Sequence, residues 1–315
     1  MICYIIRRIL YIIPAVFGIV LITFLLFNLL AGDITNEYTG PYADKAERDR
    51  VRSQLGLDKP LFFSIDSQFL NHLKNAVTFN FGRARDREKI IDKIKKGALN
   101  SLSLTVPILL GTVFLSVSLS LAFAFSHSRI VDFIFSIFCV LGMSIPFLSF
   151  ILFGQYFLAY KCGLFPVYFW PDLSAVEYLM LPVMIGIITG LPANIRLYRA
   201  VMLNETRSDY VRTAFAKGLP VRLILFKHIL KNAMAPVITR VVMSIPFLFL
   251  GSLLLERFFG IPGVGSLTAE AIAARDYQLL NAIVYLMAFL VVIFTLVADV
   301  CHFLFDPRIS LEPNH

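Results

Sequence analysis

The sequence predicts an all-α polytopic membrane protein with six transmembrane helices and a helical external loop between the first two. Of its 315 residues, 58% are hydrophobic and only 16% are charged, and the mean hydropathy is +0.76. Soluble domains are nearer half apolar and a quarter charged. A large soluble core would not need unbroken apolar runs of about 20 residues, the length that crosses a bilayer. The lipid bilayer is therefore the first partner that we expect.

The six spans follow from these apolar runs. The first run comes after Arg7 and Arg8, and it is too long for the apolar region of a cleaved signal peptide, so we expect it to remain as a helix. Pro146 should kink the third span, with neighbouring helices satisfying the freed carbonyl. Pro182, Gly190 and Pro192 should break the fourth. The expected spans are 9–30, 102–125, 133–160, 179–195, 237–255 and 281–303.

The same pattern divides the chain into three parts. Residues 1–32 hold the N-terminus and the first span, 33–99 form an extracytoplasmic loop region, and 100–315 form a core domain with five spans. The loop region has thirteen Lys or Arg against ten Asp or Glu, and at this length loop charge does not set orientation. Within it, 43–55 and 87–96 have the spacing of short amphipathic helices. We expect a small packed cap outside the membrane rather than a specific docking site.

A basic stretch in the cytoplasmic loop 196–236 indicates the orientation. From Arg196 to Lys231 there are eight basic and two acidic residues, a net charge of +6 out of +8 for the whole protein. The positive-inside rule places this stretch in the cytoplasm, and six spans then place both termini there. The excess of basic over acidic residues is explained by membrane topology, so no nucleic acid partner is predicted.

Within this stretch, the residues predict a helix, a sharp turn and a second helix. Ser208 can cap the first helix through its hydroxyl, and Asp209 then lies in the first turn, where a negative charge is favourable. Gly218 fits the left-handed position just past a helix end. Pro220 suits the start of the second helix, which we expect from 221 to about 234, along the membrane surface.

The stretch resembles the cytoplasmic signature loop of ABC-importer permeases. In that family the pattern is Glu-Ala-Ala, three residues, Gly, nine residues, then Ile-x-Leu-Pro. Residues 212–214 read Arg-Thr-Ala in the triplet, so Arg212 replaces the acidic residue, and Gly218 follows three residues later. Residues 228–230, His-Ile-Leu, replace the usual ending. The run from Asp209 to Leu219, DYVRTAFAKGL, is similar to the oligopeptide/dipeptide branch of the family.

Other stretches resemble the same branch over nearly the whole chain. Residues 56–60 resemble a short motif of its first external loop, and 259–265 followed by 275–277 resemble its last external loop. Asp299 and residues 306–308 resemble its closing segment. The long loop after the first span is similar to that of the B-type subunit of the paired permeases.

The resemblance implies a type I ABC importer permease fold in a bacterial cytoplasmic (inner) membrane. The expected partners are a second permease in a heterodimer, two ATPase subunits and an extracytoplasmic solute-binding protein. This chain would bind no cofactor, ATP being held by the partner subunits, whose closure would move the loops and switch the spans between inward- and outward-facing states. The expected cargo is a di- or oligopeptide, with nickel, glutathione or another small solute as the alternative. The residues expected to couple to the ATPase are Asp209, Tyr210, Arg212, Thr213, Ala214, Lys217 and Gly218.

Polar residues inside the spans are candidates for the translocation path, although helix packing explains each of them equally well. Arg240 and Asp299 lie near the cytoplasmic ends of their spans, and we expect them to be able to pair. The candidates are Asn28, Gln155, Asn194, Arg240 and Asp299.

Other classes of function find little support. There is no GxxxxGK[ST] phosphate loop, so ATP hydrolysis is expected in partner chains. No catalytic or metal site is predicted, because His127, His228 and His302 lack a suitable spacing and the four cysteines form no CxxC pair. An ion-coupled secondary transporter is the remaining rival, with Asp299 as its candidate intramembrane acid.

Overall fold

The computed structural model describes residues 2–30, 35, 39, 44–54, 57–62, 64, 66–124, 129–170 and 174–305. The Gly56 and 306–308 positions of the family motifs, and the side chain of Asn28, lie outside the described residues. The described part is helical and has no β-strand, only an isolated antiparallel bridge between Arg83 and Lys89. The chain forms two compact units, one of residues 1–100 and 262–296, the other of 101–261 and 297–315.

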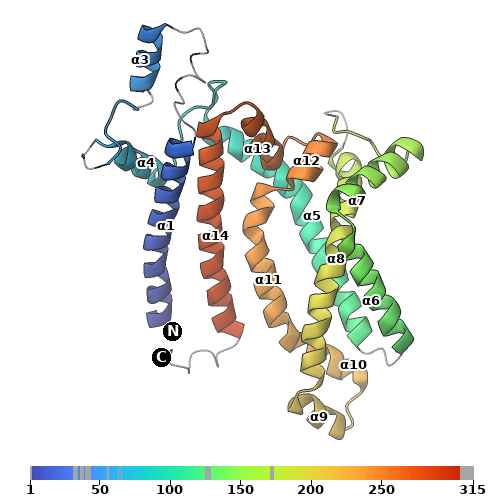
Figure 1. The fold of residues 1–315 in the computed structure, drawn as a ribbon. Helices are drawn as coiled ribbons and strands as arrows, with labels where there is room; N and C mark the ends of the chain where they lie inside the picture. Colours follow the sequence, from blue (N-terminus) through green and yellow to red (C-terminus); the bar gives the residue numbers. More distant parts are fainter. Residues whose placement is uncertain are drawn as a thin grey trace. The chain divides into compact units, whose positions relative to one another are not determined.

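The first unit joins the N-terminal helix to the last long helix through a small helix of the 33–99 region. Its core consists of Val20 and Phe24 of α1, Phe69 and Ala76 of α4, and Tyr285 of α14, all buried together. Rings meet edge to face in this core, which adds to the stabilisation from burial. Its helices are α1 (Ile2–Leu30), α3 (Lys45–Gln54), α4 (Gln68–Val77), α13 (Val264–Ala273) and the first part of α14 (Tyr277–Phe305) (Figure 1).

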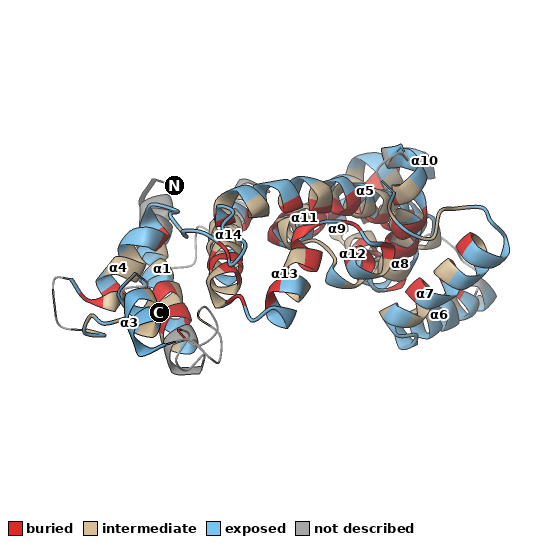
Figure 2. Ribbon diagram, turned by 90° about the horizontal axis from the view of Figure 1, so that it is seen from above, coloured by how far each residue is buried: buried red, intermediate tan, exposed pale blue. Residues whose placement is uncertain are grey.

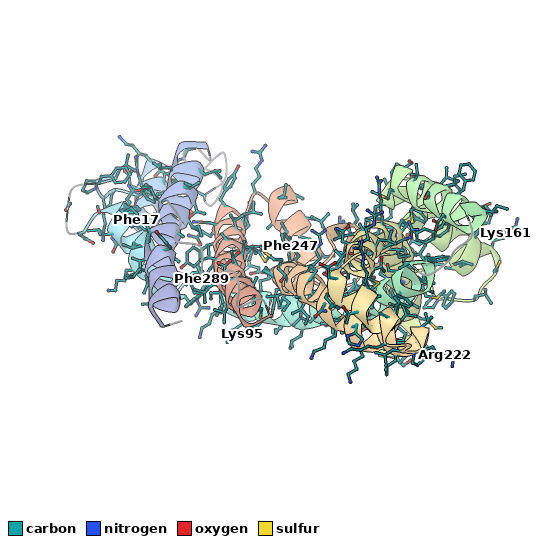
Figure 3. The ribbon with its side chains drawn as sticks, turned by 90° about the horizontal axis from the view of Figure 1, so that it is seen from below. Phe17, Lys95, Lys161, Arg222, Phe247 and Phe289 are labelled. Atoms are coloured by element: carbon teal, nitrogen blue, oxygen red, sulfur yellow. The ribbon has the colours of Figure 1, made fainter. Side chains whose placement is uncertain are left out.

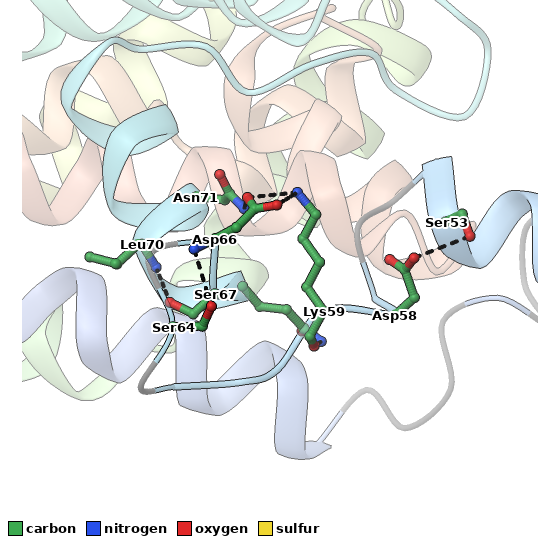
Figure 4. Close-up of polar contacts among 9 residues, drawn as sticks. Ser53, Asp58, Lys59, Ser64, Asp66, Ser67, Leu70 and Asn71 are labelled. Carbon is green, nitrogen blue, oxygen red and sulfur yellow. Dashed lines mark hydrogen bonds and ion pairs between the residues drawn. The ribbon is translucent and has the colours of Figure 1, made fainter.

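The 33–99 region contains one of the predicted helices and one that sequence reasoning missed. The helix expected at 43–55 is α3, whereas α4 was not predicted. The Leu70 N–H donates to Ser67 Oγ at 3.3 Å, which caps the start of α4. Lys59 Nζ lies 2.7 Å from Asp66, which also accepts from Asn71 Nδ2 at 3.1 Å (Figure 4). The hydrogen bond from Lys59 holds the pKa of Asp66 below its ordinary value.

The start of α14 is fixed by a buried carboxylate. Asp276 accepts a backbone N–H from Arg85 at 2.9 Å and another from Leu279 at 3.1 Å. The Arg85 guanidinium also donates to the Ala274 carbonyl at 2.9 Å. One side chain therefore caps a long helix and ties the segment around Arg85 to the segment before α14, which accounts for an acid at this position.

The second unit contains the remaining long helices. The helix predicted at 87–96 is not separate, because Ile90 already begins the 35-residue α5. The helices of this unit are α5 (Ile90–Ala124) from Ser101 onward, α6 (Arg129–Ser144), α7 (Phe147–Phe153), the π-helix η1 (Gly154–Lys161), α8 (Ala175–Thr206), α9 (Asp209–Ala216), α10 (Val221–Leu223), the π-helix η2 (Ile224–Leu230), α11 (Lys231–Leu250), α12 (Leu253–Phe259) and the end of α14 from Val297.

Proline has two different effects in these helices. Pro146 is the N-cap residue of α7, and the chain bends by 89° there, so the predicted kink is a full break. By contrast, α8 runs unbroken through Pro182 and Pro192, and the predicted interruption is wrong. Neighbouring helices can compensate a missing hydrogen bond in a membrane helix, so proline alone does not decide the outcome.

Small residues let α8 pack closely on α5. An added Cβ at Gly186 would meet Ile108, and one at Gly190 would lie 3.0 Å from Thr112 Cγ2. Two glycines spaced by four residues are a common way for membrane helices to approach each other. This contact stabilises α8 beside its two prolines.

The described residues include four helices long and apolar enough to cross a membrane, or five if the bent pair α6 and α7–η1 forms one span. In α1, the apolar helix over Leu10–Leu26 is shorter than the other candidate spans. Six spans therefore remain a prediction. Large apolar side chains are exposed along α6, such as Ile130 and Phe133, as expected of a surface that meets lipid (Figure 2).

Candidate functional site

The site predicted from the sequence is a short helix at the end of the second unit. α9 follows α8 after Arg207 and Ser208, and the chain then turns at Gly218 into α10 (Figure 1). The predicted order of helix, turn and helix is confirmed. Helix α9 has only eight residues, too few to be stable alone, so its conformation depends on its ends and on packing.

The C-terminal end of α9 is closed by a Schellman motif. Gly218 has a φ of 71°, in the left-handed region that favours glycine. Its N–H donates to the Phe215 carbonyl at 2.9 Å, and the Leu219 N–H donates to the Ala214 carbonyl at 3.3 Å. These two hydrogen bonds define the motif and satisfy carbonyls that the helix end would leave free. The prediction for Gly218 is confirmed.

The N-terminal end differs from the prediction. Ser208 is the N-cap residue, but its side chain makes no cap hydrogen bond. Its hydroxyl instead donates to the Glu205 carbonyl at 2.6 Å and so ties the turn to the end of α8. Ser208 thus stabilises the junction between two helices rather than the first turn of α9.

The second helix of the motif does not lie separately on the surface. Pro220 is the N-cap residue of α10, as its position suggested. The chain then continues through η2 into α11 without a break, so the expectation of a separate helix over 221–234 was wrong. A π-helical segment inside a longer helix often marks a functional region. The turn at Gly218 is therefore joined directly to a long apolar helix.

Two small side chains attach α9 to the rest of the unit. Val211 and Ala214 are 1% and 4% exposed. They belong to one buried cluster with Leu121 of α5, Met202 of α8 and Ile224 of η2. Burial of Val211 alone contributes about 2 kcal/mol. Because Ala214 is small, α9 lies close against the ends of α5, α8 and η2.

Tyr210 adds a polar link to the same helix ends. Its hydroxyl donates to the Glu205 carboxylate, and its ring centroid lies 6.4 Å from that of His228. Burial raises the pKa of Tyr210, and the hydrogen bond to Glu205 raises it further. Tyr210 therefore stays protonated near neutral pH and remains a donor.

The other predicted coupling residues lie on the exposed side. The Asp209 and Arg212 side chains are 98% and 75% exposed and lie 3.8 Å apart. Such an exposed pair contributes little stability. Because Arg212 replaces the acidic residue of the family pattern, the exposed side of α9 carries both a negative and a positive charge. Exposed residues of α9 and its turn include Asp209, Tyr210, Arg212, Thr213, Phe215, Lys217 and Gly218, and Arg222 of α10 is exposed as well (Figure 3).

The polar residues predicted inside the spans do not gather at one place. Gln155 Nε2 donates to the Phe258 carbonyl at 2.8 Å and the Val167 carbonyl at 3.2 Å, so it holds η1 against α12. Asn194 Nδ2 donates to the Gly190 carbonyl of its own helix at 2.9 Å. These contacts favour packing roles for both. Arg240 is exposed and Asp299 is half-buried; their pairing remains a prediction.

Sequence reasoning missed a buried acid and an ion pair of the second unit. Glu256 of α12 is fully buried and accepts from Ser101 Oγ at 2.7 Å. Arg199 Nη2 of α8 lies 2.6 Å from Asp132 Oδ1 of α6. Glu256 directly follows an apolar run, a signal that could have identified it, because ionisable residues at membrane depth are usually functional.

Comparison with known proteins gives a consistent result along the chain. A family model described as "Binding-protein-dependent transport system inner membrane component" matches residues 115–311. Its N-terminal counterpart, "Binding-prot-dependent transport system membrane comp, N-term", matches residues 1–87. Similar proteins include the glutathione transport system permease protein GsiC of Escherichia coli (strain K12) and that of Shigella flexneri serotype 5b (strain 8401). Each is 30% identical over 313 residues, covering 99% of this chain and 100% of the relative.

Proposed function

Because the chain belongs to the binding-protein-dependent transport system inner membrane components, the permease family of ABC importers, we propose that α9 docks on a separate ATPase subunit. The chain would then form one half of the translocation pathway for short peptides. ATP hydrolysis would take place in the partner subunits, and this chain would convert their closure into movement of its spans.

The attachment of α9 is the observation that carries this proposal. Val211 and Ala214 fix α9 to the ends of α5, α8 and η2, while its opposite side is exposed. A helix held in this way moves with the helices behind it, so a force on its exposed side is passed to them as rigid-body motion. A flexible basic loop that served topology alone would need neither a Schellman motif nor a buried cluster.

The proposed cargo is a di- or oligopeptide, or a peptide-like solute such as glutathione. Glutathione is itself a short peptide, so the similarity to glutathione transport system permeases supports this chemical class. Nickel or another small solute is the alternative cargo. A solute-binding protein would select the cargo and deliver it to the external side.

We further propose a heterodimer in which this chain is the B-type permease, with both termini in the cytoplasm. The net charge of +6 between Arg196 and Lys231 supports this orientation, because it places the α9 face on the cytoplasmic side. The exposed charges of α9 would then face the ATPase.

The first experiment separates ATP-driven import from ion-coupled transport. Proteoliposomes that contain the two permeases, the ATPases and the binding protein should take up labelled peptide only when ATP is supplied to the α9 side. Uptake driven by an ion gradient without ATP would overturn the proposal.

The second experiment tests docking by α9. Gly218→Trp should abolish co-purification of the ATPase, because it adds bulk and strains the turn. Gly163→Trp is a matched control, since both glycines have positive φ and open space around the missing Cβ. The control should still bind the ATPase. Equal ATPase binding by the two variants would contradict docking at this turn.

A further inference from the structure

An apolar cavity of about 340 Å³ lies in the second unit, between α5, α6 and α8. All of its lining side chains are apolar, so water inside it would find no hydrogen-bonding side chain, and such cavities stay dry or take apolar ligands. Its volume is that of a small-molecule pocket. The lining residues are Leu119, Phe123, Ile134, Phe135, Phe138 and Ile195.

The cavity opens along α6. Ile134 and Phe138 are 61% and 57% exposed, whereas Phe135 between them is 8% exposed. Figure 2 shows α6 as largely exposed along its length. Because α6 is part of a candidate span, its exposed apolar side chains meet lipid chains rather than water. Membrane lipids can therefore reach the cavity from this side.

Two arginines of α8 stand beside the cavity. The Arg199 guanidinium lies 5.9 Å from the ring centroid of Phe135, and its Nη2 pairs with Asp132 at 2.6 Å. Its Nε is buried without a hydrogen-bond partner. Arg196, one turn earlier on α8, is exposed and directly follows Ile195, which lines the cavity. Two arginines against Asp132 leave a net positive charge here.

We propose that this cavity binds one acyl chain of an anionic phospholipid, with the lipid phosphate held by Arg196 and Arg199. The apolar lining matches the chain, the opening along α6 gives access from the bilayer, and the excess positive charge matches the headgroup. Basic residues near a membrane surface attract anionic lipids, and arginine donates to phosphate in pairs of hydrogen bonds.

The position of the cavity gives the lipid an influence on α9. Leu119 and Phe123 line the cavity, while Leu121 on the same turn of α5 lies in the cluster with Val211 and Ala214. A lipid in the cavity thus packs against the helix end to which α9 is attached. Bound lipid would stabilise one position of that end.

The test uses the assembled transporter in vesicles of equal phosphatidylglycerol and phosphatidylcholine, with retained lipids counted by native mass spectrometry. The wild type should retain phosphatidylglycerol. Ile134→Trp and Phe138→Trp, both at exposed positions of the opening, should reduce that retention at least about fivefold. Ile130→Trp is the matched control, because Ile130 is 71% exposed on the same helix but does not line the cavity. It should retain the lipid.

A second pair of variants tests the headgroup. Arg196→Gln should lower the preference for phosphatidylglycerol over phosphatidylcholine by about fivefold, the effect expected of one basic residue near an anionic lipid. Lys161→Gln removes an exposed charge elsewhere in the unit and should leave the preference unchanged.

Three results would overturn the proposal. Unchanged retention in both tryptophan variants would exclude the cavity as the site. Retention by the isolated chain that disappears in the assembled transporter would mean that the second permease covers this face. Equal binding of free glycerol phosphate would mean that the arginines bind the phosphate without the acyl chain.

Discussion

Two short helices, α4 in the first unit and α9 in the second, are attached to long helices in different ways. α4 buries an aromatic residue, Phe69, whose ring lies 5.4 Å from that of Phe24 and 5.6 Å from that of Phe62. α9 buries only Val211 and Ala214. A serine precedes each helix, but only Ser67 of α4 caps with its hydroxyl.

Under the proposed function, this difference separates a structural cap from a mechanical contact. Large rings give α4 a broad apolar contact, which mainly contributes stability. The small residues of α9 are buried in the cluster with Leu121, Met202 and Ile224, so the position of α9 is sensitive to a change of a few atoms. Changes in α4 should therefore alter stability more than coupling, and changes in α9 should do the reverse.

The largest loss of stability is expected in α4. Phe69→Ala removes a buried ring and should lower the free energy of unfolding by about 3–5 kcal/mol. Leu70→Ala, at the neighbouring 43% exposed position, should cost far less. Thermal unfolding of the purified chain measures both. A Phe69→Ala variant that is as stable as the wild type but loses ATPase binding would break the comparison.

The next effect is expected at Ala214. Ala214→Leu overpacks the contact below α9, costs about 1–3 kcal/mol and displaces the helix. ATP hydrolysis stimulated by the binding protein should fall at least about tenfold, which a displacement cost of about 1.4 kcal/mol would produce. Ala216→Leu makes the same change on the exposed side and serves as the control. If transporters assembled with either variant hydrolysed ATP at the wild-type rate, coupling would not depend on the close packing of α9 at Ala214.

The paired serines give a smaller difference. Ser67→Ala removes a helix cap and should cost about 1 kcal/mol. Ser208→Ala should cost less at the start of α9, since its hydroxyl donates to Glu205 instead. Hydrogen exchange at the first amides of each helix distinguishes the two. If Ser208→Ala increased exchange at the start of α9 more than Ser67→Ala increased it at the start of α4, Ser208 would act as a cap in solution.

The smallest effect concerns Tyr210 and pH. Its raised pKa means that the link to Glu205 is complete below the ordinary tyrosine pKa, about 10, and is lost as pH rises through the raised value. A spin label at position 215 should therefore become more mobile in strong alkali. Tyr210→Phe should make the label at position 215 more mobile at every pH, with no further increase in alkali. The substitution should lower the free energy of unfolding by under about 1 kcal/mol, because Tyr210 is 37% exposed. A label with the same alkaline response in Tyr210→Phe would exclude the link.

The helical class, α3, the break at Pro146 and the turn at Gly218 were predictable because each depends on local properties. The length of an apolar run, a helix cap and a positive φ each depend on residues that are close together in the sequence. The course of α8 through Pro182 and Pro192 was not predictable, because it depends on a distant helix packed against Gly186 and Gly190. For the same reason α10 and η2 could not be recognised as the start of a helix that continues to Leu250.

The candidate site was predicted in part. The position of the turn and the exposure of Asp209, Arg212 and Lys217 agree with a surface motif. The burial of Ala214 needed the structure, because α9 has apolar side chains on both sides, Val211 on the buried side and Phe215 on the exposed side. Glu256 was missed since its burial depends on the break at Gly251, where φ is 73°.

The central claim is that the exposed side of α9 contacts an ATPase, and crosslinking tests it most directly. A photoreactive amino acid replaces Phe215, which is 48% exposed on α9, or Tyr160, which is 74% exposed on η1. In the assembled transporter, position 215 should crosslink to the ATPase subunit and position 160 should not. An importer that retains ATP-driven uptake while position 215 gives no ATPase crosslink would contradict the claim.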